Sequence, residues 1–220
     1  SVDGFTSIGA PIVLDGVKVT IVSQPPIALF ADLKTLYEAP QKLIAAGFGD
    51  MLGKITSLAD WRLGALLWDE PFDESIARRS ETAIELCKSN AVAIGQRSPE
   101  AVHHLMEILV ESGLCMLDFG DSRPASGAEH HASHYWEMKL LLEKRPAILH
   151  GAKVGFALIR VAQQYEKIRS ISREEVLGRL EGATLPDREA EIEHMREGYG
   201  PVTNSLVKTH GAFLNLTPEG

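Results

Sequence analysis

The chain has 220 residues, of which 45% are hydrophobic and 24% are charged, and its formal net charge is -8. This composition is typical of a globular protein with one substantial core, and the acidic balance argues against a general nucleic-acid-binding surface. No run of 18 apolar residues is present, so we expect no membrane-spanning segment. Cys87 and Cys115 do not form a CxxC pair, and we expect reduced thiols in a cytoplasmic protein.

The first 31 residues predict extended structure. Residues 11–14 and 17–22 flank Asp15-Gly16, which is the pattern of a β-hairpin with a tight turn. After two prolines, the apolar residues 27–30 predict a further short, buried strand.

From Asp32 onward the spacing of apolar residues becomes helical. Asp32 is the expected cap of a helix over residues 33–38. Pro40 is expected to begin a short helix that ends at Gly47, and Asp50 to begin a long amphipathic helix that reaches about Trp68.

The rest of the chain also predicts helices, which gives a mainly α fold with a short β unit at its N-terminal edge. We expect a helix after Ser98 to continue through residues 112–121, and a helix carrying His130 to end before Pro146. The remaining helices are expected over residues 75–95, 150–168, 172–181, 187–197 and 201–213.

Two histidines, His130 and His134, are four residues apart and would share one face of a helix. Ser126 and Glu129 match the capping box that begins a helix. The pair alone does not establish a metal site, because the zinc-protease motif needs His-Glu-x-x-His and most histidine pairs at this spacing are solvated or satisfied by hydrogen bonds.

Two further candidate ligands strengthen the hypothesis of a metal site. Asp50 and His150 would complete a set with His130 that contains one carboxylate and two imidazoles. These donors suit zinc, nickel, iron or cobalt better than calcium. Three protein ligands leave positions for substrate, and a metal so held lowers the pKa of a substrate hydroxyl as a Lewis acid.

Four motifs together resemble the glycerol-1-phosphate dehydrogenases, and especially the bacterial branch encoded beside arabinose-utilisation genes. These enzymes belong to the superfamily of iron-containing alcohol dehydrogenases and dehydroquinate synthases. The resemblance covers nearly the whole chain and implies the helical C-terminal domain of the dehydroquinate synthase-like fold. The motifs are Gly47-Phe-Gly-Asp50, Asp60-Trp-Arg62, Ser122-Arg-Pro-Ala-Ser-Gly-Ala-Glu-His130-x-x-x-His134 and His150-Gly151.

The resemblance implies roles for individual residues. Asp50, His130 and His150 match the ligands of one divalent metal ion, zinc or nickel, and Asp50 also lies against the substrate. His134 matches a substrate-side imidazole that relays a proton, and Asp3 matches a substrate-binding carboxylate.

Two other residues are candidates for binding. Ser7 matches a contact to the cofactor in the same resemblance. Arg123 is our candidate for the phosphate clamp, because a guanidinium binds phosphate oxygens in a bidentate way, and a structural anchor of its loop is the alternative.

The implied reaction is reversible hydride transfer between sn-glycerol 1-phosphate and NAD(P), which gives dihydroxyacetone phosphate, in a homo-oligomer. The chain contains no glycine-rich dinucleotide-binding loop. We therefore expect residues 1–31 to be the last strands of a missing N-terminal dinucleotide-binding domain, and residues 32–220 to be the metal- and substrate-binding domain. Alone, this chain would bind NAD weakly or not at all and be inactive.

Three alternatives stay open. Dehydroquinate synthase shares the fold, although its first ligand is typically Glu where this chain has Asp50. A glycerol dehydrogenase would act on an unphosphorylated polyol. The third alternative is a non-catalytic helical interaction domain in which the histidines are incidental.

Overall fold

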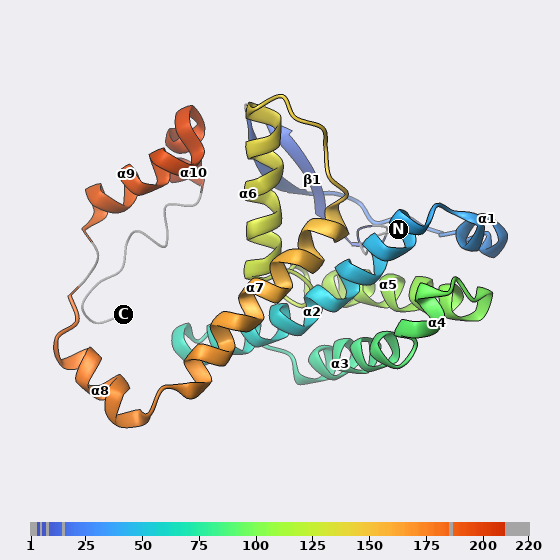
Figure 1. The fold of residues 1–220 in the computed structure, drawn as a ribbon, viewed down its shortest axis with the longest axis horizontal. Coiled ribbons are helices and arrows are strands. Elements are labelled where there is room, and N and C mark those ends of the chain that lie inside the picture. The colour runs from blue at the N-terminus through green and yellow to red at the C-terminus, as the bar shows by residue number, and fades with distance from the viewer. Residues whose placement is uncertain (1–3, 5, 8, 15, 185–186, 210–220) are drawn as a thin grey trace.

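The computed structural model describes residues 4, 6–7, 9–14, 16–184 and 187–209, and its architecture is mainly α with one β-hairpin (Figure 1). The expected fold class is confirmed. Helices α2 and α7 lie side by side, α3 and α5 pack on the other side of α2, and α6 crosses near the hairpin. The helices are α1 (Leu33–Glu38), α2 (Gln41–Trp68), α3 (Glu74–Ser89), α4 (Ala91–Gly95), α5 (Pro99–Phe119), α6 (Ala128–Leu142), α7 (His150–Ser170), α8 (Arg173–Glu181), α9 (Arg188–Tyr199), the short 3-10 helix η2 (Gly200–Val202) and α10 (Thr203–Thr209).

Strands β1 (Gly9–Leu14) and β2 (Val17–Val22) form the predicted antiparallel hairpin. Gly16 adopts a positive φ of 81°, as a tight turn requires, while Asp15 lies outside the described residues. Val17 is buried in an apolar cluster with Met138 of α6 and Val202 of η2. The hairpin is therefore packed against the helices through one side of β2.

The strand predicted over residues 27–30 is wrong. The segment has no regular secondary structure, and Ile27 and Phe30 are 99% and 95% exposed. A strand needs a neighbouring strand to satisfy its backbone groups. Among the described residues, β1 and β2 form the one strand pair, and residues 27–30 are not part of it. The apolar composition of residues 27–30 predicts burial, but no described part of the chain covers Ile27 or Phe30.

Helix α2 is one continuous element, which corrects the prediction of a break at Gly47. Pro40 caps the helix from outside, and Asp50 lies in its interior rather than at its start. The glycines of this segment serve close packing: a methyl group on Gly49 would overlap the carbonyl oxygen of Gly151 in α7, and one on Gly151 would overlap the carbonyl oxygen of Ala46. The two backbones touch there, and this contact places Asp50 beside the start of α7.

The helix predicted over residues 75–95 is interrupted. Asn90 ends α3 because its side-chain amide donates a hydrogen bond to the carbonyl of Leu86, at 2.9 Å, and α4 begins after it. Helix α5 continues to Phe119, as expected. The last predicted helix, over residues 201–213, is the 3-10 helix η2 followed by α10, and residues beyond 209 lie outside the described part.

The main apolar core lies between α2, α3 and α5. It includes Met51, Cys87, Leu105 and Leu109, all of which are buried. No helix among those that the structure describes is both long and apolar enough to cross a membrane. This core holds α2 rigidly, and the opposite side of α2 carries the side chains of the candidate site.

Candidate metal centre

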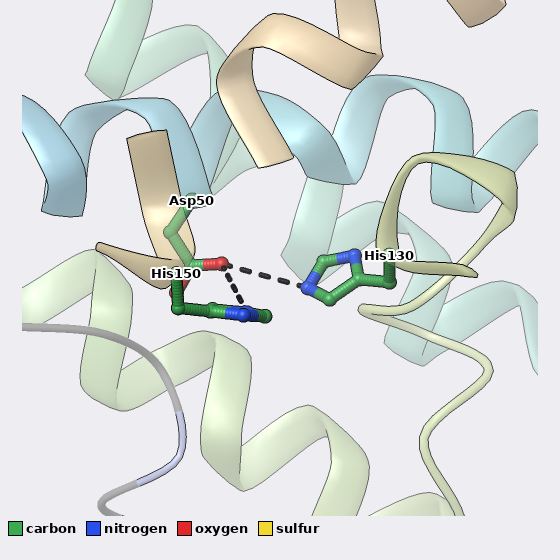
Figure 2. Close-up of side chains that lie close together, drawn as sticks. All are labelled: Asp50, His130 and His150. Carbon is green, nitrogen blue, oxygen red and sulfur yellow. Dashed lines mark ion pairs between the residues drawn. The ribbon is translucent and has the colours of Figure 1, made fainter. Parts of the chain in front are cut away.

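Three predicted ligands meet where α2, α6 and α7 converge. Asp50 comes from the interior of α2, His130 from the first turn of α6, and His150 is the first residue of α7. Each offers a ligand atom, and these atoms lie within 4.8 Å of one another. Figure 2 shows both imidazoles directed toward the same carboxylate oxygen.

The two distances from Asp50 to the imidazoles match the spacing of ligand atoms around a tetrahedral ion. Asp50 Oδ1 lies 3.5 Å from His130 Nε2 and 3.6 Å from His150 Nε2 (Figure 2). Bonds of about 2.1 Å at tetrahedral angles separate neighbouring ligand atoms by roughly 3.4 Å. One small divalent cation therefore fits between these three side chains with little movement.

The carboxylate of Asp50 is fully buried and is held in its charged form. Burial alone would raise its pKa, but Lys54, His130 and His150 outweigh this and hold the pKa well below its usual range. Lys54 Nζ lies 3.4 Å from Asp50 Oδ1, one turn along α2. An anionic oxygen is therefore present at neutral pH, as metal ligation requires.

Glu129 orients His130, and the sequence analysis missed this role. Its Oε1 lies 2.7 Å from His130 Nδ1, and the carboxylate also accepts hydrogen bonds from Thr56 Oγ1 (2.5 Å) and Ser57 Oγ (2.6 Å). Although burial opposes ionisation, these contacts lower the pKa of Glu129 to about 2. A carboxylate at Nδ1 favours the proton there and leaves Nε2 free to bind a metal beside Asp50.

The predicted capping box at the start of α6 is only half correct. Ser126 is not the capping residue, because α6 is preceded directly by Gly127. Glu129 does turn back and accept a hydrogen bond from the backbone N–H of Gly127, at 2.8 Å. The backbone N–H of Ala128 donates to Asp60 Oδ2 at 2.6 Å, and Tyr165 donates to the other oxygen of Asp60. Helices α2 and α7 thus fix the N-terminus of α6, from which His130 projects.

His134 lies one turn beyond His130, next to the three-residue cluster. Its ring centroid is 6.5 Å from that of His130 and 6.2 Å from that of His150. Burial, followed by the nearby Lys18 and the other histidines, lowers the pKa of His134 to about 3. Its imidazole is therefore neutral at physiological pH and has an unprotonated nitrogen that can accept a proton.

A cavity of about 570 Å³ opens in front of the histidines. This volume is within the usual range for small-molecule sites. The hairpin, α6, α7 and the loop before α6 contribute its walls. The charged or hydrogen-bonding side chains at its surface are Ser7, Lys18, Thr20, Asp121, Ser122, Ser126, His130, His134, Glu137, Arg145, His150 and Lys153.

The remaining predicted residues divide between the cavity and the outer surface. Ser7 lines the cavity, and its Oγ lies 3.2 Å from the backbone N of Gly9. Asp3 lies outside the described residues. Arg123 is not among the residues that line the cavity; its guanidinium pairs with Asp121 at 2.9 Å and with Glu70 at 3.4 Å. These contacts are those of the loop anchor that we kept as the alternative.

Comparison with known proteins shows which sequences this chain resembles. Residues 1–40 match the iron-containing alcohol dehydrogenase family. The chain is 52% identical over 166 residues, 76% of this chain and 42% of the relative, to the glycerol-1-phosphate dehydrogenase [NAD(P)+] of Halalkalibacterium halodurans. It is 47% identical over 209 residues, 91% of this chain and 53% of the relative, to the protein of that name from Bacillus subtilis.

The similarity extends to archaeal proteins. The chain is 40% identical over 160 residues, 73% of this chain and 45% of the relative, to the glycerol-1-phosphate dehydrogenase [NAD(P)+] of Pyrococcus furiosus. The chain spans about half the length of the curated relatives it matches. The first 40 residues thus match the iron-containing alcohol dehydrogenase family, and the relatives that the chain resembles over most of its own length are glycerol-1-phosphate dehydrogenases.

Proposed function

We propose that this chain is the metal- and substrate-binding part of an NAD(P)-dependent oxidoreductase that interconverts sn-glycerol 1-phosphate and dihydroxyacetone phosphate. The observation that carries the proposal is a set of three ligand atoms within 4.8 Å of one another, two of them on imidazoles that line a cavity large enough for a three-carbon phosphate. The shared name of the relatives supplies the reaction.

Asp50, His130 and His150 would hold one zinc or nickel ion, and Glu129 would keep His130 in the tautomer that binds it. When bound, the metal supplies Lewis acidity that lowers the pKa of a substrate hydroxyl, and NAD(P) donates or accepts the hydride. Asp50 also lies against the substrate in this proposal, as the resemblance to the family implies.

His134 is the proposed proton relay. Its pKa is lowered to about 3, so the ring is neutral at physiological pH. A neutral imidazole can pass on the proton that the substrate hydroxyl loses on oxidation by accepting it at one nitrogen and releasing one from the other, and can return it on reduction. Its place beside the cluster, yet outside the three-ligand set, separates proton transfer from metal binding.

We assign residues 1–31 to the last strands of a nucleotide-binding domain and residues 32–220 to the metal- and substrate-binding domain. Ser7, on the cavity wall beside the hairpin, is a proposed cofactor contact, and Asp3 is a proposed substrate-binding carboxylate. The complete enzyme would be a cytoplasmic homo-oligomer, and the chain alone would bind NAD(P) weakly and be inactive.

Elemental analysis of the purified chain tests the metal site first. We expect one zinc or nickel ion per chain, and its loss in Asp50→Ala and His150→Ala. The complete protein, loaded with metal, should then oxidise NADH or NADPH in the presence of dihydroxyacetone phosphate but not of unphosphorylated dihydroxyacetone. Absence of metal even after supplementation would favour a non-catalytic helical domain, and turnover of the unphosphorylated ketone alone would favour a glycerol dehydrogenase.

A further inference from the structure

Two buried lysines from distant parts of the sequence meet at one carboxylate inside the cavity. Lys18 lies on β2 and Lys153 in the first turn of α7, and their side chains are only 7% and 4% exposed. Their Nζ atoms lie 2.7 Å and 2.8 Å from the same oxygen, Oε2 of Glu137 on α6. All three residues line the cavity whose wall also carries His130, His134 and His150.

The charges of this group do not cancel. Two ammonium groups share one carboxylate, which leaves one positive charge in excess. Among the described residues, Glu137 is the only carboxylate that pairs with either lysine. A buried charge is costly unless an opposite charge accompanies it, and each ammonium has three N–H donors, of which Glu137 can use only part. The group is therefore suited to receive an anion from the cavity.

Rigid elements hold the two lysines in position. The backbone N–H of Lys18 contacts Sδ of Met138 at 3.3 Å, which ties β2 to α6. Lys153 follows the close contact between α2 and α7 by half a turn, and this contact allows little movement. The lysines are thus arranged before any ligand arrives, and preorganised charges bind anions with little cost of ordering.

The group also lies at a useful distance from the reacting end of the cavity. Glu137 follows His134 by three residues on α6, and Lys153 follows His150 by three residues on α7. Three residues of helix span about 4.5 Å along the axis. Both helices therefore place a cluster of charge about one turn from the histidines, a span that a small phosphate ester with a hydroxyl on the adjoining carbon can bridge.

We infer that Lys18 and Lys153, with Glu137 between them, form the phosphate-binding subsite of this cavity. The inference rests on the proposed function for the identity of the phosphorylated polyol, and it replaces Arg123 as the candidate clamp. Phosphate oxygens accept hydrogen bonds from both ammonium groups and supply the negative charge that Glu137 alone does not. Glu137 bridges the two lysines and holds them in place when the cavity contains no anion.

The test uses the complete, metal-loaded protein with inorganic phosphate as the probe in titration calorimetry. Lys18→Met and Lys153→Met each retain the apolar stem and remove the charge. We expect each to raise the Kd for phosphate about tenfold or more, with metal content unchanged. Lys139→Met is the matched control, since this lysine lies on α6 but pairs with Glu143 at the surface, and it should leave the Kd unchanged.

Removing a buried cation beside Glu137 can destabilise the fold, so Glu137→Gln provides a second test of opposite sign. It removes the competing anion and should tighten phosphate binding several-fold. In steady-state assays with dihydroxyacetone phosphate, both lysine variants should raise KM much more than they lower kcat. Unchanged phosphate affinity in folded lysine variants, or weaker binding in Glu137→Gln, would overturn the inference.

The outcomes separate this inference from the proposed function. If phosphate binding depends on the two lysines but dihydroxyacetone phosphate is never reduced, the subsite stands and the proposed reaction fails. If dihydroxyacetone phosphate is reduced with the same KM in wild type and in both lysine variants, the reaction stands and the subsite is overturned. Repeating the titration with metal-free protein removes any phosphate that binds through the ion.

Discussion

The candidate metal centre and the N-terminal segment over residues 22–30 differ in which side chains they bury and expose. Around the centre, Asp50, Lys54 and Glu129 are buried charges with charged or hydrogen-bonding neighbours from the bundle. In the N-terminal segment, Ile27 and Phe30 are large apolar side chains that are almost fully exposed. Burying charge is costly and exposing apolar surface is unfavourable, so each region departs from ordinary packing in its own way.

The difference shows which side chains find their partners within this chain and which do not. The charges of the candidate centre are balanced by residues of α2, α6 and α7, and the chain itself contains all three candidate ligands of the proposed metal. The apolar side chains of the N-terminal segment find no partner among the described residues, and in the proposed assignment they belong to a nucleotide-binding domain. The experiments below test each side of this comparison.

Replacing Asp50 should have the largest effect. Asp50→Ala removes the central ligand and the carboxylate 3.4 Å from the buried Lys54 ammonium. We expect complete loss of bound metal, loss of turnover in the complete protein, and a fall of about 3–5 kcal/mol in the free energy of unfolding. Elemental analysis and urea denaturation measure these effects. Stoichiometric metal in the variant would refute the ligand assignment.

Replacing His134 should affect chemistry without affecting the metal. His134→Ala removes the proposed relay, and general acid–base catalysis typically contributes about 10²- to 10⁴-fold to rate. We expect kcat of the complete protein to fall by that order while elemental analysis still gives one ion per chain. His131→Ala, the next histidine but on another face of α6, is the control that should retain turnover. Equal turnover in wild type and His134→Ala would exclude the relay.

Replacing Glu129 tests the orientation of His130. Glu129→Gln keeps the size of the side chain but weakens its hold on His130 Nδ1, so the tautomer that presents Nε2 is less favoured. Outer partners of this kind typically alter metal affinity by about 10- to 100-fold. Competition with a chelator measures the affinity. Glu143→Gln, at the exposed end of α6, should leave the affinity unchanged, and the same result for Glu129→Gln would contradict the role.

The contact of α2 with α7 can be tested by a single methyl group. Gly151→Ala would force the added carbon into the carbonyl oxygen of Ala46, so the helices must separate. We expect a loss of about 1–3 kcal/mol in stability. Gly178→Ala is the matched control on α8, where an added carbon meets nothing within 4 Å, and it should stabilise by up to about 1 kcal/mol. Thermal unfolding that shows equal effects would contradict the close contact.

The glycines also show why part of the fold could not be predicted from the sequence. Local signals were reliable: Asp32 and Ser172 cap their helices through side-chain oxygens, and the turn at Gly16 joins the two strands. Gly47 was predicted to end a helix because glycine does so locally, yet it lies inside α2. The neighbouring Ala46 and Gly49 contact Gly151 of α7, about 100 residues away in sequence, and no local pattern reports this contact.

The candidate site also has a part that the sequence motifs predict and a part that depends on packing between distant segments. The ligand residue types at Asp50, His130 and His150 were visible in the motifs, and the structure brings the three together. The partnership of Glu129 with His130 had a weak signal, an acidic residue directly before the ligand, which was interpreted as helix capping. The meeting of Lys18 and Lys153 had none, because it depends on how the hairpin packs against α6 and α7.

Replacing Phe30 should have the smallest effect on the stability of this chain, and it tests directly whether another domain covers the N-terminal segment. In this chain the side chain is 95% exposed, so Phe30→Ala should change the free energy of unfolding by less than about 0.5 kcal/mol. Leu109→Ala, in the buried core, should cost about 2–5 kcal/mol and calibrates the assay. In the complete protein, Phe30→Ala should cost about 3 kcal/mol or more if a nucleotide-binding domain covers this segment. An effect equally small in both proteins would show that Phe30 stays at the surface, and the contrast between the two regions would then have no bearing on domain assembly.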